Sequence, residues 1–190
     1  MEQGTFEYLT YFKNRDFTKK ANAIIVGFFY QHKYDNDINF FLVCGIAQLK
    51  IIIPELKKKA LNFDRAKKNW FSTTEFYSII ALIRMGDFAN LDNIIAATEL
   101  ELDANIRVLR LLKYLAYTLN SDCMNLMSKY LSSLDRIKGF HGLGDTDYGE
   151  YIVGYLSTYL EDFPVKFNYL GYYTKDEIET TKVFLKKYNR

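Results

Sequence analysis

Turn-forming residues are scarce in this sequence, which has two prolines and ten glycines among its 190 residues. Folds built from many short strands need frequent turns rich in Gly, Pro, Asn and Asp. The scarcity favours long helices joined by short connections. We therefore predict an all-α fold.

Apolar residues recur at helical spacing along the chain. In segment 104–119, Val108, Leu112, Leu115 and Leu119 fall at i, i+4, i+7 and i+11, and basic residues occupy the opposite face. Such a stripe is typical of an amphipathic helix that buries one side. The pattern predicts a helix over this segment.

Two hydroxyl residues, Ser72 and Thr174, each precede a glutamate by three positions. This spacing is a capping box, in which hydroxyl and carboxylate accept hydrogen bonds from the free backbone N–H groups of a helix start. We expect helices to begin at both sites. Weaker N-cap candidates are Thr18, Asn36, Asp103 and Ser121.

The β-branched runs 24–26 and 51–53 would also suit strands. They lie in longer segments with Asn or Asp starts and no hairpin dipeptide between them, so we favour helix for both. Pro54 lacks an N–H group and restricts the residue before it. We expect it to break or kink the second of these helices.

Segments 76–99 and 111–133 each have the pattern of helix, short turn, helix. Their turns, near Gly86 and Asn120, lie 34 residues apart, a period found in helical-hairpin repeats. We predict antiparallel helical hairpins packed as a single array, similar to a helical-repeat protein.

Charge is balanced overall, with 25 basic and 23 acidic residues, which does not favour a chain that coats nucleic acid. A chain of this length fits one domain, 1–190, with a division into 1–70 and 71–190 as the alternative. Segments 85–106 and 139–165 contain no Lys or Arg, and each carries five carboxylates. These segments are the predicted acidic patches.

The first residues have acidic side chains where a secretory signal needs basic ones, and no apolar core follows. Apolar runs reach only 12 residues, against roughly 18 for a membrane-spanning helix. Cys44 and Cys123 lie in apolar segments, as reduced core thiols do. We expect a cytoplasmic protein that binds neither membranes nor nucleic acid directly.

His32 and His141 are the only histidines, and their separation provides no metal-binding pair. His141 with Asp145, Asp147 and Glu150 could bind a divalent cation or act in acid–base catalysis. A solvated loop that caps the next helix is the reading we favour. We expect no enzyme activity, metal or cofactor, and keep a metal-assisted hydrolase as the least favoured alternative.

Tyr148, Tyr151, Tyr155 and Tyr159 follow one face of the next predicted helix. Such a row packs at the edge of a core or presents aromatic rings to a partner, and the sequence leaves both open. Because the helix carries no Lys or Arg, an exposed row would favour a protein over a nucleic acid.

A series of short segments follows one another between residues 76 and 177: Tyr77–Leu82, Asn90–Ile95, Leu111–Leu112, Lys129–Leu131, the loop with His141, Tyr148–Tyr151 and Tyr172–Asp176. In this layout, residues 76–177 resemble immunity proteins of the PoNi type, which neutralise polymorphic nuclease toxins of bacteria. The chain departs from the family pattern at Ile152, where the family has Trp, at Tyr155, where it has Glu, and at Thr174, where it has Pro.

The resemblance implies an immunity protein that occludes a basic nuclease toxin by stoichiometric binding. Acidic patches would suit this role, because they steer association with a basic surface. A helical-repeat adaptor for another protein is the alternative, and a monomer and a homodimer both remain open. The expected partner-binding residues are Asp145, Asp147, Glu150, Tyr151, Glu99, Glu101 and Asp103.

Overall fold

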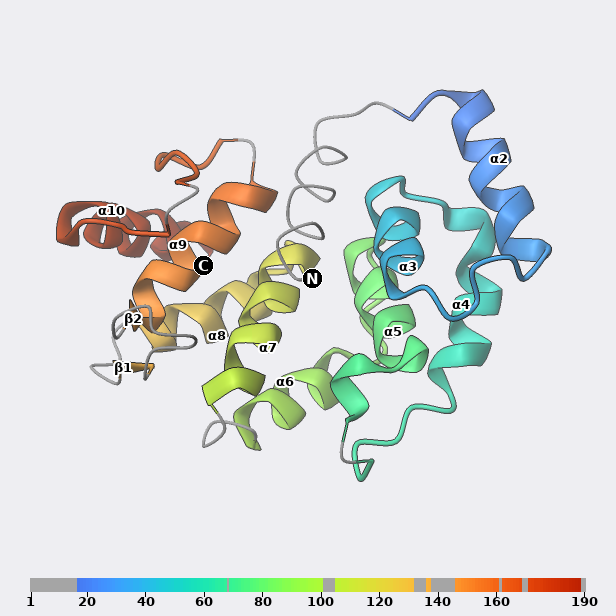
Figure 1. Ribbon diagram of the computed structural model, residues 1–190, viewed down its shortest axis with the longest axis horizontal. Helices are drawn as coiled ribbons and strands as arrows, with labels where there is room; N and C mark the ends of the chain where they lie inside the picture. Colours follow the sequence, from blue (N-terminus) through green and yellow to red (C-terminus); the bar gives the residue numbers. More distant parts are fainter. Residues whose placement is uncertain are drawn as a thin grey trace. The chain divides into compact units, whose positions relative to one another are not determined.

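The described part of the chain in this computed structural model is helical apart from one short strand pair (Figure 1). The structure describes residues 17–67, 69–100, 105–131, 136–137, 146–160, 162–168 and 171–188. Within these ranges, the side chains of 97–100, 105–111, 136–137, 146–147 and 188 are left out of the description.

The α-helices are α2 (Lys19–Tyr30), α3 (Ile38–Ile46), α4 (Ile53–Ala60), α5 (Thr74–Arg84), α6 (Leu91–Leu100), α7 (Asn105–Thr118), α8 (Ser121–Leu131), α9 (Tyr148–Tyr159) and α10 (Lys175–Leu185). Short 3-10 helices are η1 (Lys50–Ile52), η2 (Trp70–Ser72) and η3 (Lys186–Tyr188). Strands β1 (Arg136–Ile137) and β2 (Thr146–Asp147) pair antiparallel, with Arg136 opposite Asp147.

The chain divides into two units, residues 1–93 and 94–190, and the boundary falls within α6. The predicted all-α class is confirmed. The two helix–turn–helix segments are present as α5 with α6 and α7 with α8. The single repeating array and the single domain stay predictions.

In the first unit, α5 packs against α3 and α4. Its N-terminal half contributes Phe76, whose ring lies 5.2 Å from that of Trp70 and 6.4 Å from that of Phe63. The contact with Trp70 is edge-to-face, and such contacts add to the apolar area that the rings bury. Gln48 joins two helix ends, because its Nε2 donates to the backbone oxygens of Gly45 at 3.0 Å and Arg84 at 3.1 Å.

In the second unit, α9 packs against α7 and α8, and α10 packs against α8 and α9. Figure 1 shows α9 and α10 beside each other in orange and red. Val153, Val165 and Tyr173 form a buried cluster, against which Phe163 and Ile178 pack. The cluster holds the segment between α9 and α10 against α9.

Helix starts agree with the sequence in two cases and differ by one residue in three others. Thr18 accepts a hydrogen bond from the Ala21 N–H, and Thr174 forms the predicted capping box. The predicted caps at Ser72 and Asn36 are wrong. Thr73 caps α5 and Asp37 caps α3 instead, each the next side chain able to accept the same bond.

Asn120 caps α8, because its Oδ1 accepts hydrogen bonds from the backbone N–H groups of Asp122 and Cys123. The cap predicted at Ser121 is therefore wrong. Leu119 was predicted on the buried stripe of the preceding helix. It lies past the end of α7 at φ 53° and is 37% exposed. Gly86 lies in the turn predicted after α5 and takes a left-handed conformation there, with φ 90°. Asp103 lies outside the described residues.

The β-branched run 24–26 is helical, as predicted, and 51–53 passes from η1 into α4. Pro54 lies in the first turn of α4. The predicted break there is wrong, because a missing N–H costs nothing in a first turn, where that group has no helical acceptor.

Candidate functional site

The start of α9 touches the segment that precedes α10. Glu150, half-buried in the first turn of α9, accepts a hydrogen bond at 3.4 Å from the backbone N–H of Tyr173 to its Oε1. A carboxylate is also favoured in a first turn, because the helix N-terminus carries partial positive charge. The contact joins two segments that lie 23 residues apart in the chain.

Asn168 and residues 171–173 are joined by several hydrogen bonds. Asn168 donates from Nδ2 to the Tyr172 oxygen at 2.8 Å and from its backbone N–H to the Tyr173 hydroxyl at 3.1 Å. Gly171 allows the turn with φ 71°, and its N–H donates to the Asn168 oxygen at 3.0 Å. Tyr173 is 7% exposed, whereas its neighbour Tyr172 is 60% exposed.

The Tyr173 ring lies beside Gly154 of α9. A Cβ atom at position 154 would lie 3.5 Å from the Tyr173 hydroxyl oxygen, at ordinary contact distance. Glu150 and Gly154 are one helical turn apart, so they meet Tyr173 from the same face of α9. Together these residues form a corner in which Tyr173 points inward. We call Glu150, Gly154, Asn168, Tyr172 and Tyr173 the tyrosine corner.

The predicted tyrosine row of α9 is divided between core and surface. Tyr148 is 5% and Tyr159 is 2% exposed, and their rings contact Tyr130 and Tyr117 respectively. Tyr151 and Tyr155 are half-buried, with ring centroids 6.2 Å apart. The ends of the row therefore belong to the core, and its middle reaches the surface.

Of the predicted partner-binding residues, the structure describes the side chains of Glu150 and Tyr151, which are adjacent on α9. Asp147 lies on β2 and Glu99 on α6, both with undescribed side chains. The remaining predicted residues, Asp145, Glu101 and Asp103, lie outside the described residues.

One carboxylate of the predicted acidic segment 85–106 has a structural role. Asp87 is paired with Lys57 at 2.5 Å, with 16% of its side chain exposed, and its Oδ1 accepts a bond from the Ala89 N–H at 3.3 Å. The pair fixes the end of α5 to α4. Its negative charge is therefore compensated within the first unit.

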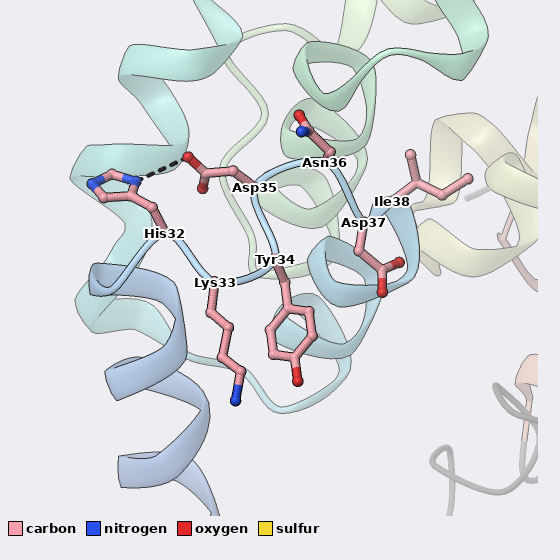
Figure 2. A pocket seen from close by; sticks show the side chains of 7 residues that line it. All are labelled: His32, Lys33, Tyr34, Asp35, Asn36, Asp37 and Ile38. Carbon is pink, nitrogen blue, oxygen red and sulfur yellow. Dashed lines mark hydrogen bonds and ion pairs between the residues drawn. The ribbon is translucent and has the colours of Figure 1, made fainter.

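A shallow hollow lies over the loop between α2 and α3 (Figure 2). His32 and Asp35 point toward each other across it, with Nδ1 and Oδ2 2.9 Å apart. Lys59 lies 3.8 Å from the other carboxylate oxygen of Asp35. His32 has 77% of its side chain exposed, so solvent screens this pair.

The described residues contain no cluster of three His, Cys, Asp or Glu side chains able to hold a metal ion. His141 lies outside the described part of the chain. Burial raises the pKa of the Cys44 thiol to about 12 and that of Cys123 to about 11. A thiol with such a pKa stays protonated near neutral pH and is a poor nucleophile.

The fold and the tyrosine corner define an all-α protein that presents an exposed tyrosine on a turn fixed by hydrogen bonds. Among the described residues, no helix is both long and apolar enough to span a bilayer. No protein-family model, curated protein or solved structure matches the chain.

The sequence did not identify the exposed Tyr172 or the bond between Glu150 and Tyr173. The available signal was local. Gly171 permits a left-handed turn, and the capping box at Thr174 fixes the start of α10 directly after the two tyrosines. Tyr173, of the two adjacent tyrosines, faces the core beside Gly154, and this contact lies 19 residues away in the sequence.

Proposed function

We propose that this protein is a cytoplasmic immunity protein that binds a cognate bacterial nuclease toxin and blocks it by occlusion. One observation carries the proposal. The hydrogen bond from Tyr173 to Glu150 joins the helix start Tyr148–Tyr151 to the segment Tyr172–Asp176, two of the segments that resemble PoNi-type proteins. Two segments that both resemble the family, and that lie far apart in the sequence, thus contact each other in this chain.

The chemistry of the corner suits a protein partner. Tyr151 and Tyr155 are half-buried and Tyr172 is mostly exposed, and tyrosine provides large contact area with few rotatable bonds. Segment 139–165 has no Lys or Arg, so α9 itself presents no positive charge that would repel a nuclease. A nuclease surface is basic because it binds phosphates.

The test is co-expression with the product of the reading frame beside the gene. If the proposal holds, that product alone arrests growth, the pair grows normally, and the two proteins co-purify at a ratio of one to one. Purified immunity protein should also inhibit DNA or RNA cleavage at equimolar concentration.

A neighbouring product that is harmless and does not co-purify would count against the proposal. It would leave the helical adaptor as the better account. Cleavage that continues within a stable complex would retain the binding and refute inhibition by occlusion.

A further inference from the structure

We draw no further inference here: the strongest candidate, the outward apolar face of α2 on which Ala23, Ile24 and Tyr30 are exposed, carries nothing, because nothing in the described part of the structure shows what covers it.

Discussion

Tyr172 and Tyr173 provide a matched pair for testing the architecture of the tyrosine corner by stability alone. They are neighbours of the same residue type, yet one is 60% and the other 7% exposed. Tyr173→Ala removes a ring that packs with Val153 and Val165, and truncating a buried aromatic costs about 3–5 kcal/mol. Tyr172→Ala should cost no more than about 0.5 kcal/mol, as surface changes do.

Tyr173→Phe separates the ring from its hydroxyl. The hydroxyl accepts one hydrogen bond, at 3.1 Å from the Asn168 N–H, and loss of such a bond costs about 1 kcal/mol. The three variants should therefore rank in stability as Tyr172→Ala, Tyr173→Phe and Tyr173→Ala, from least to most destabilised.

The assay is thermal and denaturant unfolding followed by circular dichroism. For a chain of this length about 1 kcal/mol corresponds to roughly 2–4 °C, so Tyr173→Ala should lower Tm by about 10 °C and Tyr172→Ala by less than about 2 °C. Equal losses for both alanine variants, or a larger loss for Tyr172→Ala, would refute the placement of Tyr173 in the core and of Tyr172 at the surface.

Three further predictions test other parts of the fold. Gly27 lies inside α2 with open space around a new Cβ, so Gly27→Ala should raise the free energy of unfolding by about 0.5–1 kcal/mol. Gly86 has equal space but a φ of 90°, so Gly86→Ala should lower the free energy of unfolding by about 1–2 kcal/mol. Denaturant unfolding measures both changes. Thr174→Ala removes the capping box of α10 and should cost about 1 kcal/mol in the same assay, with Thr174→Asn restoring most of it. Burial raises the pKa of Cys44 to about 12 from its ordinary value of 9.0, so as pH rises the unfolded chain loses the thiol proton first. The stability of the wild type relative to Cys44→Ala should be constant below pH 9 and fall between about pH 9 and pH 12. A constant difference across that range would contradict the burial of Cys44. Thiol labelling at pH 8 should be slow in the native protein and fast in denaturant.

The sequence predicted helices well because their signals are local. The capping box at Thr174 needs only two side chains three positions apart, and both are where the structure uses them. In the run 72–74, three hydroxyl residues in succession offer equivalent caps. Tertiary packing chooses among them: Trp70 and Phe71 are buried in η2, which places Thr73 at the cap.

The division of the tyrosine row could not be predicted in the same way. Spacing places Tyr148, Tyr151, Tyr155 and Tyr159 on one face, but does not say which helices cover that face. Tyr130 of α8 and Tyr117 of α7 meet the two ends of the row from positions far away in sequence. Tyrosine suits both environments, so composition did not decide between them.

Two carboxylates of the predicted acidic segments have partners within the chain, and this bears on how the proposed complex should respond to salt. Asp87 is paired with Lys57, and Glu150 bonds to the backbone of Tyr173. A complex governed by carboxylate steering would lose association rate steeply as salt rises. A complex whose main contacts are the rings of Tyr151, Tyr155 and Tyr172 should instead show a modest salt effect on association, and Tyr172→Ala should act mainly by speeding dissociation. Stopped-flow mixing at several salt concentrations separates the two, and a steep salt dependence with an unchanged dissociation rate in Tyr172→Ala would return the main role to the acidic residues.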